Sequence, residues 1–275
     1  MNKGQISNLL RQCGLLNFTD WIRYYLQKFK NRSVNRKFKK NNPDVVLPPD
    51  YLIYESFQLN YSKYYTESIG TAQWLVDYFS KHIELKNKKI LDWGCGPGRV
   101  VRHLPSIIGN ECKYYGTDYN NKTIDWCTKS LSGIIFNRNI LEAKLPYPDN
   151  FFDVIYGISI FIHLSEQMHY DWFNEIHRIL KPDGIIFLTT QGNNFRVKMT
   201  RKELANYSKG KLVVRGNVKE GHRNYSAFQP EGFMKNLFQN VQILEHDEPK
   251  PEAGKGLPQD IWIIRKNANQ TTDKN

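Results

Sequence analysis

The chain is poor in cysteine and has no long apolar run. Its four cysteines form no C-x-x-C pair and follow no metal-ligand spacing, which predicts reduced thiols and no structural zinc site. No stretch approaches the roughly 20 consecutive apolar residues of a membrane span. The first residues lack the apolar core and small-residue cleavage site of a secretory signal, so a cytoplasmic location is expected.

Acidic side chains are scarce at the N-terminus. Residues 1–42 contain ten basic side chains against the single acid Asp20, and so carry +9 of the net charge of +12. The remaining residues are close to neutral, which argues against a domain built to grip a long phosphate backbone. Nucleic acid is therefore not the expected partner of that larger segment.

The basic arm has apolar side chains at the spacing of one helical face, within a helix predicted over residues 5–31. This face could dock on the rest of the protein as a lid or dimer element. It could also lie on an anionic membrane, giving peripheral contact with the inner membrane face, or touch nucleic acid. The sequence leaves these three interpretations open. The apolar residues are Phe18, Trp21, Ile22, Tyr25, Leu26 and Phe29.

Composition divides the chain into three segments. Residues 1–50 are the basic arm and a polar connector (31–44), residues 51–266 form an α/β domain, and residues 267–275 are a polar tail expected to be disordered. From Lys88 on, short apolar strands alternate with helices, which predicts a parallel sheet covered on both faces. The last two strands are joined without room for a helix and are expected to pair antiparallel. Strands are predicted at 89–93, 114–117, 134–136, 153–158, 184–189, 241–245 and 260–264, and helices at 71–81, 100–107, 122–131 and 165–180.

The clearest functional signal follows the first of these strands. Asp92 ends it, and glycines then stand at every second position, Gly94, Gly96 and Gly98, before a helix expected to begin at Arg99. Alternating glycines let the backbone turn sharply and approach a ligand without an intervening Cβ. The N–H groups of a helix that starts there would point toward a carboxylate or phosphate.

An acid lies where a ribose is bound in doubly wound folds. Asp118 comes 20 residues after Gly98, just past the second strand. A dinucleotide fingerprint has the spacing G-x-G-x-x-G, whereas the third glycine here comes one residue early. The carboxylate of Asp92 suits the cationic amino group of S-adenosylmethionine (SAM). SAM is thus favoured over a nicotinamide cofactor and over a tight turn without a ligand.

Four segments of the chain together resemble successive motifs of class I SAM-dependent methyltransferases. The resemblance covers roughly residues 70–266 and is greatest to a subgroup found beside glycosyltransferases and polysaccharide-building enzymes. It implies a Rossmann-like, seven-stranded, mostly parallel sheet in which the last strand is antiparallel and inserted before the sixth. The four segments are residues 90–102, 116–120, 151–156 and 178–184.

The resemblance also implies which residues bind the cofactor. Asn139 and Ile140 should flank the adenine, although the family more often has an acid at the position of Asn139. A further set, Gly157, Ile158 and Ser159, should line the path to the sulfonium. The complete expected cofactor site is Asp92, Gly94, Gly96, Gly98, Asp118, Tyr119, Asn139, Ile140, Gly157, Ile158 and Ser159.

His163 is the candidate catalytic residue, because it follows the fourth strand and an imidazole there can take a proton from a hydroxyl. The alternative is a polar anchor for the next helix. Gln191 and Gln229 stand where the subgroup often has histidines, and acceptor positioning is their expected role. Glu175 and Arg178 are expected on a solvated helix face.

These observations predict a SAM-dependent methyltransferase that needs no metal. By analogy with the subgroup, the acceptor would be a hydroxyl of a saccharide or related small molecule. The alternatives are a small-molecule or lipid methyltransferase of another pathway and a non-catalytic SAM-binding regulatory subunit. The sequence does not specify the acceptor, the methylated atom or the oligomeric state.

Overall fold

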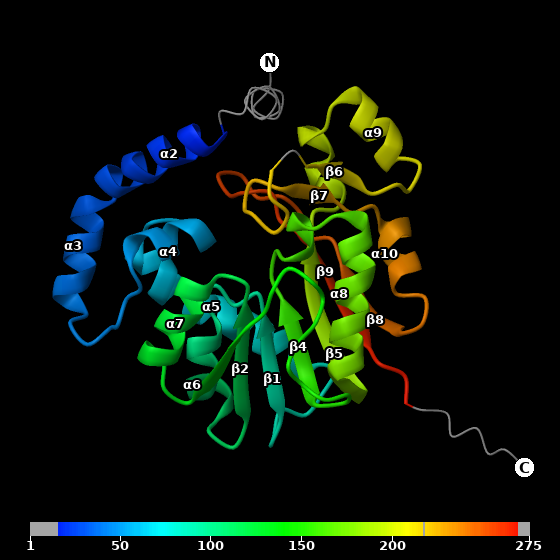
Figure 1. Cartoon of the computed structure of the whole chain (residues 1–275), viewed down its shortest axis with the longest axis horizontal. Helices are drawn as coiled ribbons and strands as arrows, with labels where there is room; N and C mark the ends of the chain where they lie inside the picture. The colour runs from blue at the N-terminus through cyan, green and yellow to red at the C-terminus, as the bar shows by residue number, and fades with distance from the viewer. Residues whose placement is uncertain (1–15, 217, 269–275) are drawn as a thin grey trace, which may run out of the picture.

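A seven-stranded sheet forms the centre of the computed structural model, which describes residues 16–216 and 218–268 (Figure 1). The part of the expected first helix before Leu16, the side chain of Phe18, Cys13 and the tail from residue 269 lie outside the described residues. The other three cysteines, Cys95, Cys112 and Cys127, are buried free thiols.

The strands follow the order β3-β2-β1-β4-β5-β9-β8. β1 to β5 pair in parallel, while β9 runs antiparallel to both of its neighbours, β5 and β8. The expected Rossmann-like fold is confirmed, including the inserted antiparallel strand. The strands are β1 (Lys89–Trp93), β2 (Lys113–Asp118), β3 (Ile134–Arg138), β4 (Phe152–Gly157), β5 (Leu180–Thr190), β8 (Gln242–Asp247) and β9 (Asp260–Arg265).

Helices cover both faces of the sheet because successive strand residues point to opposite sides. Leu91 and Trp93 join one hydrophobic cluster with α8 and α10, whereas Ile90 joins a second cluster with α5 and α6. Figure 1 shows α8 in front of the sheet and α5 behind it. The helices are α5 (Tyr61–Ser80), α6 (Leu104–Ile108), α7 (Asn121–Ser130), α8 (Glu166–Ile179) and α10 (Glu231–Leu237).

Three helices precede this core: α2 (Leu16–Lys30), α3 (Arg32–Asn41) and α4 (Asp50–Ser56). The prediction of a polar connector over 31–44 was wrong for most of its length, since α3 occupies it. Two buried residues hold α3 in place. The side-chain oxygen of Asn35 accepts a hydrogen bond from the backbone N–H of Tyr61 (2.9 Å), and Phe38 packs on the Tyr61 ring. Among the described helices, none is long and apolar enough to cross a bilayer.

An insertion between β5 and α10 forms a small unit of its own, for which the sequence had suggested no elements. Its core contains Phe195, Tyr207 and Phe228. In Figure 1 this unit lies beyond the upper end of the sheet, where the parallel strands end. Its elements are η3 (Asn193–Lys198), α9 (Arg201–Tyr207), β6 (Val213–Arg215) and β7 (Ser226–Phe228).

Candidate active site

The glycine loop after β1 lines two adjoining cavities at the carboxyl ends of the strands, where doubly wound folds bind ligands. Gly94, Gly96 and Gly98 have φ angles of +75°, +50° and +69°, which glycine adopts without strain. A Cβ on Gly94 would lie 2.1 Å from Cδ1 of Ile160, so a larger residue would displace the Ile160 side chain as well as strain the backbone. Gly94 and Gly96 line the cavities. Gly98 instead packs against Leu131 and shapes the turn.

The helix expected from Arg99 begins later. The chain forms a 3₁₀ turn, η1 (Val101–His103), and α6 starts only at Leu104 with Pro105 in its first turn. The N–H of Arg102 still donates to the carbonyl of Gly98 (3.3 Å), so the helical segment starts at the glycine loop, although its first turn is 3₁₀. Backbone contacts also close the loop, as the N–H groups of Gly94 and Cys95 both donate to the carbonyl of Thr117.

Asp118 faces both cavities from the end of β2. One carboxylate oxygen accepts from the N–H of Gly96 (3.0 Å) and the other from the N–H of Asn120 (2.8 Å). Burial raises the pKa of this carboxyl, and the backbone hydrogen bonds oppose that shift. Its remaining lone pairs can accept hydrogen bonds from a ribose diol. Tyr119, the next residue, also lines both cavities.

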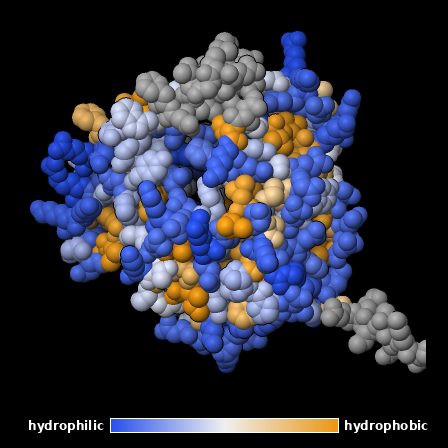
Figure 2. Space-filling model, in the orientation of Figure 1, coloured by the Kyte–Doolittle hydropathy of each residue, from blue (hydrophilic) through white to orange (hydrophobic). Residues whose placement is uncertain are grey.

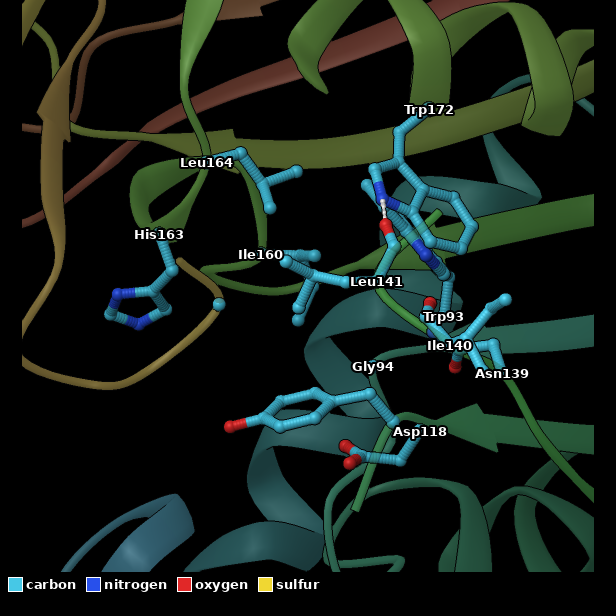
Figure 3. Close-up of a pocket in the computed structure, with 12 residues that line it drawn as sticks. Trp93, Gly94, Asp118, Asn139, Ile140, Leu141, Ile160, His163, Leu164 and Trp172 are labelled. Carbon is cyan, nitrogen blue, oxygen red and sulfur yellow. Dashed lines mark hydrogen bonds between the residues drawn. The ribbon is translucent and has the colours of Figure 1, made fainter. Parts of the chain in front are cut away.

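The first cavity is a mainly apolar slot. Figure 3 shows Trp93, Leu141, Ile160, Leu164 and Trp172 around it, with Asp118 at its lower side. The indole N–H of Trp172 donates to the carbonyl of Leu141 (3.1 Å), which fixes the loop after β3. The slot has the apolar walls that an adenine ring requires.

The expected adenine residues lie at this slot. Asn139 and Ile140 both line it. The amide of Asn139 already has partners, because its oxygen accepts from the hydroxyl of Thr117 (2.9 Å) and its nitrogen donates to the Ile140 carbonyl (2.8 Å). A hydrogen bond from adenine to Asn139 would therefore use the second lone pair of that oxygen.

Asp92 lies beneath the glycine loop and lines neither cavity. Burial raises the pKa of its carboxyl to about 7, against the opposing effects of the Tyr156 hydroxyl and the Arg99 guanidinium. Arg99 is itself held by the hydroxyl of Ser68 (3.1 Å). In this structure the Asp92 carboxyl therefore belongs to a buried polar cluster under the loop, and its contact with a ligand amino group stays a prediction.

Of the three residues expected after β4 in the cofactor site, one packs inside the protein and two line a cavity. A Cβ on Gly157 would lie 2.8 Å from Cε3 of Trp93, so Gly157 permits close packing and does not line a cavity. Ile158 and Ser159 line the second cavity. Ser159, at φ +62°, donates from its N–H to the hydroxyl of Thr189 (2.9 Å), and its own hydroxyl bonds to Gln259 (3.0 Å).

His163 ends the 3₁₀ turn η2 (Phe161–His163) and lines both cavities. Its Nδ1 lies 2.8 Å from the carbonyl oxygen of Tyr225, in the insertion. Because a carbonyl only accepts, Nδ1 carries the proton and Nε2 keeps a free lone pair. Burial lowers the pKa of His163 below its usual 6.5, so the ring is neutral at physiological pH.

Residues that the sequence did not single out close the second cavity. Leu52, Glu55 and Ser56 of α4 line it on one side and Arg223 of the insertion on another. Glu55 accepts a hydrogen bond from the side chain of Asn120 (2.8 Å), and burial together with Asp118 raises its pKa. Arg223 donates to the carbonyl of Tyr54, which joins the insertion to α4.

The comparisons with known proteins agree with this geometry. Residues 90–184 match the family described as "Methyltransferase domain". The ubiquinone/menaquinone biosynthesis C-methyltransferase UbiE of Coxiella burnetii is 27% identical over 128 residues, which are 44% of this chain and 50% of that protein. Phthiotriol/phenolphthiotriol dimycocerosates methyltransferase 1 of Mycobacterium ulcerans is 28% identical over 167 residues, 54% of this chain and 59% of that protein. The chain spans about half the length of the curated relatives it matches.

The fold is shared with solved structures. A SAM-dependent methyltransferase from Methanosarcina mazei superposes with a TM-score of 0.54 at 19% identity, over 70% of this chain and 97% of that one. Residues 90–184 thus match a methyltransferase domain, within a fold shared with SAM-dependent methyltransferases of known structure. The cofactor of this methyltransferase domain is SAM. The two named relatives carry the names of quinone and phthiotriol substrates, so they lend no support to the glycan-associated subgroup.

The residues of the methyltransferase domain fit SAM. Gly94 exposes its backbone to the cavity, Asp118 presents a carboxylate to it, and Trp93, Leu141 and Trp172 provide an apolar slot. Glu55, Ser56 and Arg223 were missed because they lie far along the chain from the glycine loop. The concentration of tyrosines from residue 51 signals that α4 is packed by its neighbours, but no signal in the sequence indicates Arg223.

Two expectations about the helix faces and loops were wrong. Glu175 is buried, accepts a hydrogen bond from the N–H of Leu145 and is paired with Arg178, so it anchors the loop after β3. Gln229 is also buried, and its amide bonds to His169 and to the N–H of Gln191. These contacts make Gln229 a scaffold residue of the insertion rather than an acceptor contact.

One group of side chains in the described residues has the composition of a metal site. His246, Glu248 and Asp260 bring one potential ligand atom each within 4.8 Å of one another. His246 stacks on Trp262 at 3.6 Å and lies 3.4 Å from a carboxylate oxygen of Asp260. That contact between His246 and Asp260 joins the neighbouring strands β8 and β9, which explains their proximity without an ion.

Proposed function

We propose that the methyltransferase domain methylates a hydroxyl group, with His163 as the general base. The observation that carries this proposal is the orientation of the His163 ring. Its Nδ1 is held by the Tyr225 carbonyl, and the ring lines the cavities that Asp118 also faces. A neutral imidazole with a free Nε2 is the form that can take a proton.

The proposed chemistry follows from that tautomer. When bound, SAM would supply a methyl carbon made electrophilic by positive sulfur, and its sulfur would leave with the carbon–sulfur electron pair as the neutral thioether of the demethylated cofactor. A hydroxyl is a weak nucleophile, so Nε2 of His163 removes its proton as the oxygen attacks. The Tyr225 carbonyl then stabilises the charged imidazolium through the Nδ1 hydrogen bond. Holding the two reactants in line in a closed site can contribute roughly 7–11 kcal/mol in the best cases.

The acceptor is proposed to be a lipid-soluble or lipid-linked molecule that carries the hydroxyl. The second cavity has apolar walls from Leu52, Ile158 and Ile160 beside the polar groups of Arg223 and His163. The names of the two relatives, which refer to quinone and phthiotriol substrates, agree with an apolar acceptor. A saccharide hydroxyl, expected from the sequence resemblance, remains the second candidate.

Labelled-methyl transfer from SAM tests the proposal. The full chain would be assayed with a quinol, a lipid-linked saccharide, a free saccharide, an amine and a thiol. His163→Gln should lower transfer to a hydroxyl by roughly 10²–10⁴ while SAM affinity is unchanged. His177→Gln is the matched control, since His177 lies on α8 and lines neither described cavity.

Three outcomes would contradict the proposal that His163 acts as general base in an O-methyltransferase. Exclusive transfer to nitrogen or sulfur would remove the O-methyltransferase assignment. An undiminished rate in His163→Gln would remove the base. SAM binding without transfer to any of these acceptors would favour a regulatory SAM-binding subunit.

A further inference from the structure

Helix α2 is amphipathic, but its large apolar side chains point away from the protein, whereas those of an ordinary surface helix point toward the core. The uncharged and acidic polar residues Asp20 and Gln27 face the protein, while the cations of the helix lie at the margins of the outward face. Asp20 accepts a hydrogen bond from the hydroxyl of Tyr54 (2.8 Å), and the side chain of Gln27 accepts from the N–H of Leu59 (2.9 Å). Tyr24 packs edge-on against Tyr54. The inward face is therefore fixed by specific contacts, and the helix is not free to roll over.

The outward face of α2 consists of large apolar side chains. Leu26 is 64% exposed and Phe29 80% exposed, values far from those of residues that pack on a core. A contiguous exposed apolar face of this kind marks an interaction surface. We define the apolar face of α2 as Trp21, Ile22, Tyr25, Leu26 and Phe29.

Cations surround this apolar face. Residues 16–41 contain eight basic side chains and one acid, and that acid, Asp20, is turned inward toward Arg223. In Figure 2, pale and orange residues over α2 adjoin deep-blue residues over α3 on the left of the molecule. The exposed cations of the two helices include Arg23, Lys30, Arg32, Arg36, Lys37 and Lys40.

We propose that α2 and α3 bind an anionic lipid bilayer, with the apolar face of α2 inserted at the level of the headgroups. Basic residues around an apolar helix face give both the electrostatic attraction and the buried area that such binding needs. A second copy of the chain is disfavoured as the occupant, because two strongly cationic arms would repel each other. Nucleic acid is the less favoured occupant, because a bilayer buries the aliphatic side chains of Ile22 and Leu26 as well as the aromatic ones, whereas bases stack only on the latter.

The opposite side of α2 adjoins the methyltransferase site. Asp20 of α2 binds Tyr54 of α4 and lies 3.9 Å from Arg223 of the insertion, and α4 and Arg223 both line the second cavity. A docked α2 would place that cavity near the lipid headgroups. The idea that the membrane delivers a lipid-borne acceptor to the site rests on the proposed function. Membrane binding by α2 and α3 does not depend on it.

Vesicle sedimentation of the full chain tests the inference. The protein should pellet with phosphatidylcholine vesicles that contain phosphatidylglycerol, and much less with phosphatidylcholine alone or at high salt. Leu26→Asp/Phe29→Asp and, separately, Lys37→Glu/Lys40→Glu should each weaken partition by about tenfold or more. The matched controls are Val197→Asp, at a residue 73% exposed on η3, and Lys209→Glu/Lys211→Glu. Both controls should bind as the wild type does.

Membrane binding would be contradicted if the wild type failed to pellet with anionic vesicles. It would also be contradicted if the Leu26→Asp/Phe29→Asp variant pelleted as much as the wild type. A change of that variant from dimer to monomer in sedimentation velocity, with vesicle binding intact, would identify a second copy as the occupant. Tight binding of a single-stranded oligonucleotide, lost in the same variant while vesicle binding is retained, would identify nucleic acid. SAM affinity should stay unchanged in every variant. A failure of the proposed methyl transfer can therefore be distinguished from a failure of membrane binding.

Discussion

Nδ1 of His163 donates a hydrogen bond to the carbonyl oxygen of Tyr225 across 2.8 Å. His163 follows β4, while Tyr225 belongs to the insertion just before β7. The insertion thereby sets the tautomer of a ring in the methyltransferase site and leaves Nε2 as the basic nitrogen.

The pH dependence of methyl transfer should reflect this burial. Because burial lowers the pKa of His163 below 6.5, the rate of transfer to a hydroxyl should rise with pH through that lowered pKa and be level at neutral pH. In His163→Gln this acidic limb should disappear from the profile of the residual rate. A limb centred above 6.5 in the wild type would show that another group is the base.

SAM affinity should depend on Asp118. Asp118→Ala should weaken binding by about 1–3 kcal/mol, the cost of a lost hydrogen bond to a charged group, as measured by calorimetry. Asp125→Ala, at an exposed position of α7, is the control. Melting of both variants without SAM shows whether loss of the Gly96 and Asn120 contacts also destabilises the loop. Wild-type affinity in Asp118→Ala would remove the ribose assignment.

Asp92 should make the folded protein less stable as pH rises. Its folded pKa is about 7, against 3.8 for the ordinary carboxyl, so the unfolded state ionises first. Between about pH 4 and 7, wild-type stability should therefore fall relative to Asp92→Asn, by an amount on the order of a few kcal/mol, and then level off. Unfolding of both proteins across this range measures the difference. A difference that does not change with pH would mean that the carboxyl is not buried uncharged.

A side chain at Gly94 would strain the glycine loop. Gly94→Ala should weaken SAM binding strongly, because its φ is +75° and the new Cβ would push the side chain of Ile160, which lines both cavities. Gly70→Ala is the counterpart in the middle of α5, where no atom lies within 4 Å of an added Cβ. It should bind SAM normally and gain about 0.4–1 kcal/mol in stability. Equal SAM binding by the two variants would contradict the cavity assignment.

Removal of residues 1–42 should leave a folded domain that binds SAM more weakly. The sequence predicted an unaffected core, because the strand–helix alternation starts at Lys88. The structure shows that Tyr24 and Phe38 belong to the cluster that supports α4, which lines the second cavity. Asp20→Ala should reproduce part of the loss by freeing Tyr54. Calorimetry with SAM and thermal unfolding measure the two effects, and loss of cooperative unfolding would show that the arm belongs to the core.

Local patterns in the sequence predicted the sheet and its ligand loop. The seven strands follow from short apolar runs, the loop from alternating glycines, and the position of Asp118 from its place after the second strand. Each of these signals is contained within a few neighbouring residues, because strand periodicity and left-handed backbone angles are properties of short segments. Resemblance supplied the rest of the cofactor site, and the cavities contain Asn139, Ile140, Ile158 and Ser159.

Tertiary structure alone decided the features that depend on distant partners. The apolar spacing of α2 predicted a helix, but which face would be covered was decided by Asp20 and Gln27 meeting Tyr54 and Leu59. The burial of Asp92 under the loop depends likewise on groups elsewhere in the chain, as does the tautomer of His163. A helical period shows that one face differs from the other, but the direction of that face is set by the hydrogen bonds and packing that the rest of the chain supplies.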